Sequence, residues 1–145
     1  MQGDDRLSTS LGLLVLRLGT GLLLVGHSWP KAQAVMEGRS IEFLDVIGLG
    51  PQLSTYLATG AEVVGGLLVA LGLATRLFAA IAAFDLGVAV FVVHLGRGQP
   101  VLQRMAEEGQ GSAEMALLYF IPLLVLIFTG PGGLSLDAMI SRRRR

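Results

Sequence analysis

Three ionisable side chains interrupt long apolar segments of this sequence: Arg17, Glu62 and Asp85. A charge at the middle of a bilayer is costly, so such residues are usually paired or functional. Each lies about eight to ten residues into its own apolar segment, at a helical rise of about 1.5 Å per residue. If the helices alternate in direction, all three side chains reach the middle third of the membrane. Their types suit ion pairing, proton handling or ligand binding.

Small residues share the helical face of each of these charges. Helical spacing places Thr20 and Gly21 beside Arg17, Gly65 and Gly66 beside Glu62, and Ala82 and Ala89 beside Asp85. Small residues let membrane helices approach closely, so the three charges should point into the bundle. We therefore predict a polar centre with one cation and two carboxyls. It is either a ligand-binding or proton-handling site, or an ion cluster that only fixes the register of the helices.

A second polar layer is expected nearer one membrane surface. Its members are His27, Trp29, Lys31, Tyr56, His94 and Glu114. The layer could be an interfacial belt, in which Trp and Tyr are favoured, or a quinone headgroup site with histidine as hydrogen-bond partner.

Metal chemistry is a further alternative for this layer. A metal site would use His27, His94 and Glu114, and bis-histidine haem ligation is possible in principle. No metal-ligand spacing is present, however, so no metal is predicted. Because Asp85 and His94 are nine residues apart, about 180° around a straight helix, the two polar layers are expected to be separate sites.

The amino-acid composition indicates the environment that surrounds this chain. Of its 145 residues, 52% are apolar and only 15% are charged, against about 25% charged in a typical soluble domain. The formal net charge is zero, which argues against a nucleic-acid binder, since that class needs a basic face. The absence of cysteine excludes disulfides and thiolate metal sites. A lipid bilayer is therefore the expected environment.

Four segments are long and apolar enough to span a membrane, which takes about 17–20 residues. They cover about residues 7–27, 53–75, 77–95 and 113–130. We predict an all-α, four-transmembrane-helix bundle forming a single domain over residues 1–145. A short interfacial helix over 41–47, capped by Ser40, is expected in the first outer loop. A water-soluble bundle would need polar helical faces that these segments lack.

The placement of Lys and Arg predicts the orientation. Six basic residues would lie on the side of the termini: Arg6, Arg76 and the four arginines 142–145. Four would lie on the other side: Lys31, Arg39, Arg97 and Arg104. The positive-inside rule therefore predicts cytoplasmic termini. The acidic start of the chain does not fit a cleaved signal peptide.

Several segments in order resemble the DoxX/DoxD family of small four-helix membrane proteins. Residues 14–18 (LVLRL) resemble its leucine-rich opening with an embedded arginine. Residues 27–31 (HSWPK) are similar to its His-Gly-x-x-Lys pattern, with Ser28 in place of the usual glycine. Residues 61–68 (AEVVGGLL), 71–76 (LGLATR), 114–119 (EMALLY) and 130–137 (GPGGLSLD) match further family segments. The resemblance covers nearly the whole chain.

The family is named for a subunit associated with a quinol oxidase and with thiosulfate:quinone oxidoreductase. The resemblance therefore implies a multi-pass protein of the bacterial inner membrane, linked to quinone, but it does not by itself make the chain an enzyme. The leading hypothesis is a membrane component of a redox system that binds quinone or a small lipophilic ligand between its helices. The alternatives are a non-enzymatic assembly or scaffold protein, acting as a homo-oligomer or with a redox partner protein, and a small proton-coupled transporter.

Overall fold

The computed structural model describes residues 2–39 and 48–143, with side chains from residue 6 onward. The described residues form helices and contain no strand, which confirms the all-α class. The interfacial helix predicted over 41–47 lies outside the described residues. The elements are α1 (Gln2–Met36), α2 (Pro51–Leu71), α3 (Thr75–Val88), the π-helix η1 (Ala89–His94), the 3-10 turns η2 (Leu95–Arg97) and η3 (Gln103–Met105), α4 (Glu114–Thr129) and α5 (Leu136–Arg143).

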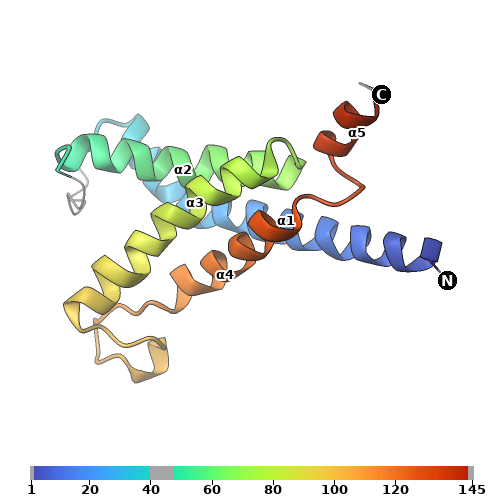
Figure 1. Cartoon of the computed structure of the whole chain (residues 1–145). Helices are drawn as coiled ribbons and strands as arrows, with labels where there is room; N and C mark the ends of the chain where they lie inside the picture. The colour runs from blue at the N-terminus through green and yellow to red at the C-terminus, as the bar shows by residue number, and fades with distance from the viewer. Residues whose placement is uncertain (1, 40–47, 144–145) are drawn as a thin grey trace.

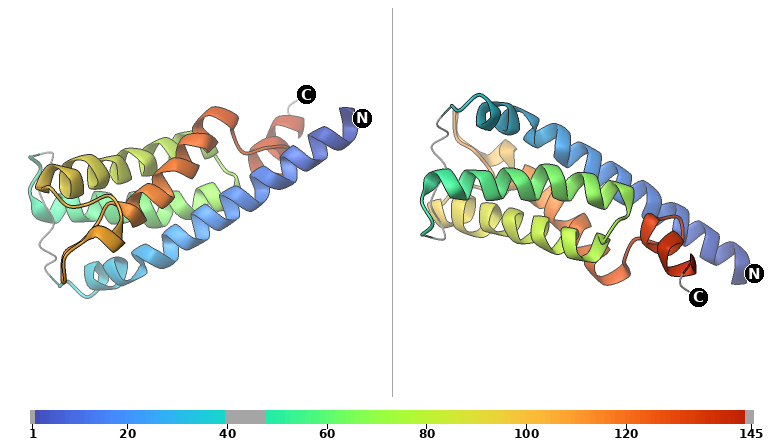
Figure 2. Two further views of the ribbon diagram at one scale, coloured as in Figure 1. Left: turned by 90° about the horizontal axis from the view of Figure 1, so that it is seen from below. Right: turned by 90° about the horizontal axis from the view of Figure 1, so that it is seen from above.

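The four long helices pack as a ring of neighbours, α1 on α2, α2 on α3, α3 on α4 and α4 on α1. Helices α2 and α3 diverge from their shared turn, so the bundle widens away from it (Figure 1). Both chain termini lie at the same end of the molecule (Figure 2). We call this the terminal end; it holds the turn 72–74 and the segment 130–143. The opposite loop end holds residues 37–39 and 48–50 and the connection 96–113.

Helix α1 is longer than the sequence pattern predicts. It starts at Gln2 and continues past the expected end at residue 27 to Met36, with Pro30 inside it. Proline removes one backbone hydrogen bond and crowds the carbonyl four residues earlier, but membrane helices tolerate it where neighbouring groups compensate. The polar stretch after Pro30 is therefore helical, and it keeps Lys31 on the bundle wall.

Among the residues that the structure describes, three helices are long and apolar enough to cross a membrane, judged by length and composition. They are Arg6–Met36, Pro51–Leu71 and the continuous helix Thr75–Arg97 formed by α3, η1 and η2. Helix α4 is apolar but has only 16 residues, or about 24 Å at the α-helical rise. That is less than the hydrocarbon core of about 30 Å.

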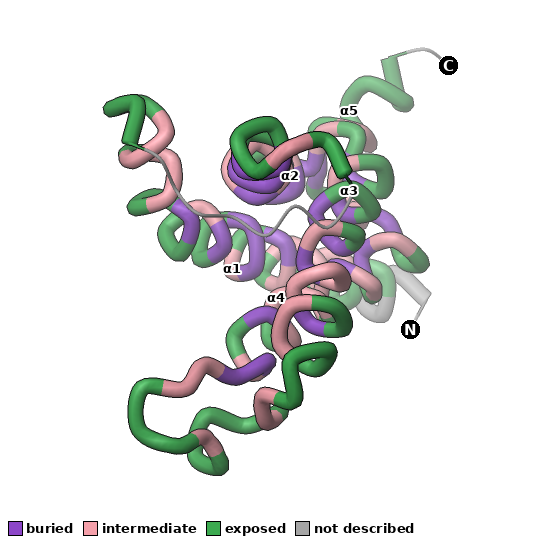
Figure 3. The backbone as a smooth tube through the Cα atoms, turned by 90° about the vertical axis from the view of Figure 1, so that its left-hand side faces the viewer, coloured by how far each residue is buried: buried purple, intermediate pink, exposed green. Residues whose placement is uncertain are grey.

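Small residues let the helices approach closely at the centre of the bundle. The carbonyl oxygen of Gly21 lies 2.9 Å from the place where a Cβ on Gly66 would be, so α1 and α2 meet backbone to backbone there. The buried core along α3 is rich in alanine, including Ala79, Ala82 and Ala83. Most of the buried residues lie on the surfaces between helices (Figure 3).

Large apolar side chains cover the outside. Val15, Phe84 and Phe128 are 70%, 68% and 79% exposed. Apolar surface on this scale is unusual for a soluble monomer and marks a lipid- or partner-facing surface.

At the terminal end, one aspartate connects the start of α5 to the turn between α2 and α3. The Asp137 carboxylate accepts hydrogen bonds from the backbone N–H of Ala74 at 2.7 Å and of Thr75 at 3.0 Å, and from the Thr75 hydroxyl at 3.1 Å. Its own N–H donates to the Gly72 carbonyl at 2.9 Å. These bonds satisfy the free amides at the start of α3 and hold Ala74 at φ +45°, a strained value for a residue with a side chain. Helix α5, which the sequence pattern did not predict, begins directly before this contact.

Candidate ligand-binding site

A cavity of about 690 Å³ lies between the diverging helices, toward the loop end. All four long helices contribute to its wall, together with η1 and the connection that precedes α4. Apolar residues such as Leu57, Ile81 and Met115 form much of the surface. A volume of this size, apolar with a few convergent polar groups, is typical of small-molecule sites.

The polar groups of the cavity centre on an ion pair between α1 and α2. Lys31 Nζ lies 2.6 Å from Glu62 Oε2. The Glu62 side chain is only 6% exposed and that of Lys31 22%. The pair is therefore largely removed from water. A charge in such an environment needs a close partner of opposite sign.

Asp85 on α3 completes this group, which we call the Lys31–Glu62–Asp85 cluster. Asp85 and Glu62 line the same cavity, and the charges of both Glu62 and Lys31 act on the Asp85 carboxyl. Two neighbouring carboxylates repel each other, so the single Lys31 ammonium offsets one of the two negative charges. A proton on the second carboxyl would offset the other.

His94 lines the same cavity as Asp85, although a straight helix would direct the two side chains to opposite sides. The reason is the π-helix η1 (Ala89–His94). A π-turn takes more residues than an α-turn, so it rotates the residues after it relative to α3, and such turns are frequent at functional sites. The two polar layers expected from the sequence therefore merge here. His94 Nδ1 lies 2.6 Å from Gln99 Oε1, which orients the ring.

His27 on α1 lies at the wall of the cavity beside Tyr119 of α4. Their ring centroids are 5.5 Å apart, and the Tyr119 hydroxyl donates to the Leu23 carbonyl at 3.4 Å. Sequence reasoning missed Tyr119 because an aromatic residue in an apolar segment gives no signal beyond core packing. It also missed Ser54 and Ser112, two buried hydroxyl residues of the cavity wall.

Arg17 does not join the two carboxyls, contrary to expectation. It is 3% exposed, and its guanidinium donates to the Leu134 carbonyl. Gly72 packs against it so closely that a Cβ there would overlap the guanidinium. Gly72 is ten residues from Glu62 along α2, or about 15 Å. Arg17 thus belongs to the terminal end, and Lys31 supplies the cation of the cluster.

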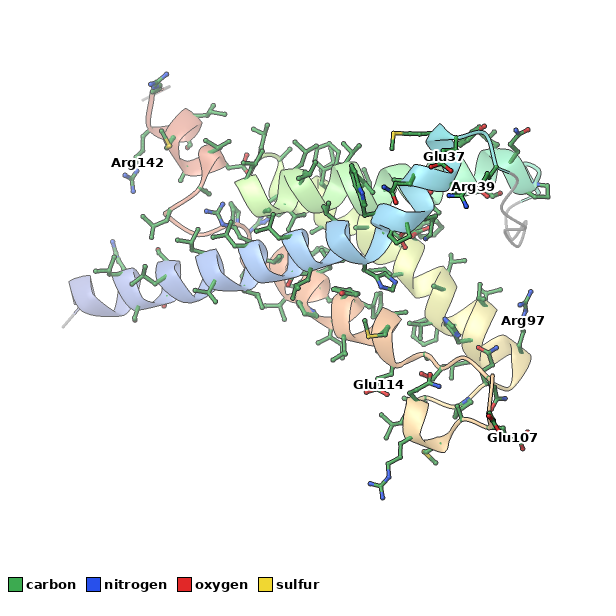
Figure 4. All side chains as sticks on the ribbon, turned by 180° about the vertical axis from the view of Figure 1, so that it is seen from behind. Glu37, Arg39, Arg97, Glu107, Glu114 and Arg142 are labelled. Carbon is green, nitrogen blue, oxygen red and sulfur yellow. The ribbon has the colours of Figure 1, made fainter. Side chains whose placement is uncertain are left out.

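The remaining residues of the expected outer layer are spread over the loop end. Trp29 and Tyr56 are 48% and 46% exposed, and neither lines the cavity. Glu114 accepts a hydrogen bond from the Gln103 backbone at 2.7 Å; Figure 4 shows it near the loop that precedes α4. No group of three His, Cys, Asp or Glu side chains within the described ranges could hold a metal ion.

Comparison with known proteins identifies the family. The DoxX family model matches residues 12–95, more than half of the chain. A protein of Bacillus subtilis (strain 168) named "Putative oxidoreductase CatD" is 32% identical over 138 residues, which cover 95% of this chain and 93% of the relative. The chain belongs to the DoxX family. An "Uncharacterized protein" of Haemophilus influenzae is 36% identical to this DoxX chain over 76 residues, 52% of this chain and 54% of the relative. No solved structure matches significantly.

The segment matched by the DoxX model contains the main polar residues of the cavity. Lys31, Glu62 and Asp85 all lie within residues 12–95, as do His27 and His94. The relative from Bacillus subtilis extends the match over α4 as well. The cavity is therefore built mainly by the part of the chain that defines the family.

Proposed function

We propose that this DoxX family protein is a membrane component of a redox system and binds a quinone, or a small lipophilic ligand of similar shape, in the cavity between its helices. The observation that carries the proposal is the cavity itself. Apolar walls from α2, α3 and α4 surround the Lys31–Glu62–Asp85 cluster, and His27 of α1 and His94 of η1 also line the cavity. The relative named as an oxidoreductase supports a redox context.

The residues present fit a quinone head. A quinone ring presents two carbonyl oxygens on a flat apolar frame, so it needs hydrogen-bond donors separated by apolar surface. Lys31 Nζ offers a donor on α1, and the histidines offer further ring nitrogens on α1 and η1. Leu57, Ile81 and Met115 supply apolar contact from three helices.

A quinone, when bound, supplies two-electron, two-proton redox chemistry. The chain's own residues bind, orient and handle protons. The Lys31 ammonium would orient a carbonyl oxygen, and the Glu62–Asp85 pair would hold one exchangeable proton beside it. The oriented His94 ring would position the opposite side of the ligand. The apolar walls would exclude bulk water from the head.

Four membrane crossings with cytoplasmic termini are part of the proposal. The position of the termini supports an even number of crossings, because both termini lie at one end of the bundle (Figure 2). Figure 4 shows Glu37, Arg39, Arg97, Glu107 and Glu114 at the loop end and Arg142 at the opposite end. Helix α4 would reach the full hydrocarbon thickness together with the residues that flank it, or by thinning the bilayer locally. The bacterial inner membrane is the proposed location.

The deciding experiment identifies what the purified protein carries. We expect mass spectrometry of the protein in nanodiscs to find a co-purified quinone, and added quinone to raise the thermal unfolding temperature. Glu62→Gln should keep the protein folded and lose the bound quinone, whereas Gly19→Ala, at a position with open space around it, should retain it. Co-purified partner proteins without a ligand would favour the scaffold alternative. Proton-coupled uptake by proteoliposomes that lack quinone would favour the transporter.

A further inference from the structure

A second hollow, of about 460 Å³, lies on the outside of the bundle between α3 and α4. All ten residues that line it are apolar or glycine. Its α3 side belongs to the helix Thr75–Arg97, which is long and apolar enough to span the membrane. The groove therefore offers nothing to a polar ligand and is shaped for hydrocarbon.

Gly87 lies in the wall of the groove, where the absence of a side chain lets the Phe120 ring pack close to α3. At Gly87 a Cβ would lie 3.3 Å from the Phe120 ring of α4. Phe91 and Phe120 meet edge to face with centroids 6.0 Å apart. A leucine at position 87 would press against the Phe120 ring and narrow the groove.

The groove and the cavity share a wall. Phe84 and Val88 line both hollows, and Asp85, which is adjacent to Phe84 in sequence, belongs to the Lys31–Glu62–Asp85 cluster. One turn of α3 thus separates the polar cluster from the apolar groove. Phe84 is 68% exposed, so none of the helices that the structure describes covers the outer side of this wall.

We propose that the ligand is a quinone with a long isoprenoid tail, whose head lies in the cavity while its tail passes the Phe84–Val88 turn and lies in the α3–α4 groove. This inference rests on the proposed function and adds the class of quinone. In a bilayer the tail gains nothing from the hydrophobic effect, because lipid chains are equally apolar. The gain comes from close packing against a matching surface, which the groove provides next to the head site.

Two photoreactive probes test the position of head and tail in nanodiscs: a long-chain quinone with an azide on the ring, and the same quinone with a diazirine in the tail. We expect the ring probe to label peptides that contain Lys31 or Asp85, and the tail probe to label residues 87–92 and 120–127. Tail labelling spread evenly over exposed α1 residues such as Val15 and Leu22, with ring labelling in the cavity, would overturn this inference alone. Absence of specific ring labelling would overturn the proposed function as well.

Groove-filling variants make the test independent of labelling efficiency. Gly87→Leu should lower tail labelling about tenfold, because the added side chain crowds the groove and weakens tail binding. Ring labelling should stay unchanged. If Gly87→Leu fails to fold, Ala80→Phe at the exposed rim of the groove is the replacement variant, with the same expected result. Gly19→Leu on α1 adds the same bulk where no atom lies within 4 Å and should change neither label. Unchanged tail labelling in a folded groove variant would contradict the tail site.

Discussion

At the scale of residues, the site depends on one lysine that faces two carboxyls. Lys31 Nζ is 2.6 Å from Glu62 Oε2, and Asp85 lines the same cavity as both residues. The Lys31 cation offsets one of the two neighbouring carboxylates, which would otherwise repel each other. The lysine is therefore the residue on which both the stability and the proposed chemistry of the cluster depend.

We expect Lys31→Met to destabilise the folded protein by about 2–3 kcal/mol. Breaking a buried pair costs about 3–5 kcal/mol, and the partial exposure of Lys31 lowers that figure. The double variant Lys31→Met with Glu62→Gln should recover most of the loss, because no uncompensated charge remains. Thermal unfolding of the four proteins in one detergent measures the coupling. A loss in the double variant equal to the sum of the two single losses would show that the ion pair does not stabilise the fold.

The sequence predicted that Glu62 and Asp85 point into the bundle, because each shares a helical face with small residues. It misplaced Arg17 because depth along a helix says nothing about the register between helices. The Gly21–Gly66 contact sets that register. It aligns Arg17 with Gly72 at the terminal end, and it brings Lys31, assigned by the sequence pattern to a loop, opposite Glu62.

At the scale of elements, the α1–α2 crossing determines where the site residues lie. A Cβ at Gly21 would overlap the Gly66 carbonyl and lie 2.9 Å from Ala70 Cβ. At Gly19, two residues earlier on the same helix, a Cβ would meet nothing within 4 Å. These two glycines form a matched pair, one at the helix contact and one outside it.

Gly21→Ala should destabilise the bundle by about 1–3 kcal/mol, because the added methyl forces the backbones of α1 and α2 apart. Gly19→Ala should be neutral or stabilise by up to about 1 kcal/mol through the better helix propensity of alanine. The unfolding temperatures of both variants in detergent test this difference. Indistinguishable values would show that the close crossing is not a determinant of stability.

Asp137 plays a corresponding part at the terminal end, where it connects α5 to the start of α3. Asp137→Ala should cost about 1 kcal/mol, the usual effect of losing a helix cap, and should speed hydrogen exchange at the Ala74 and Thr75 amides. Asp137→Asn keeps one oxygen acceptor and should lose less. Unchanged exchange at both amides in Asp137→Ala would rule out the capping role.

The π-helix η1 is the element that no periodicity argument could find. Patterns of apolar residues assume a constant rotation per residue, and the sequence AVFVVH gives no sign that this rotation changes. The change places His94 in the cavity of Asp85. The helical segments of the bundle, in contrast, were predictable because lipid imposes a simple rule of length and composition.

At the scale of the whole molecule, the distribution of charge and exposure agrees with a bilayer around the middle of the bundle. Large apolar residues are exposed along the helices, and the charged residues labelled in Figure 4 gather at the two ends. The chain contains no cysteine, so single cysteines can report the membrane side of each end without background labelling. Met105 at the loop end and Met139 in α5 suit this test, being 69% and 54% exposed.

Met105→Cys and Met139→Cys leave every charge in place, so neither changes the basic residues that orient the protein. If the termini are cytoplasmic and α4 spans the membrane, a membrane-impermeant maleimide should label Met105→Cys in intact spheroplasts. It should label Met139→Cys only after permeabilisation. Labelling of both variants from outside would mean that α4 does not cross the membrane. The residues before and after α4 would then lie on the same side, and the odd number of crossings would separate α5 from the N-terminus. Labelling of Met139→Cys alone would reverse the orientation and place the wide, cavity-bearing end of the bundle toward the cytoplasm.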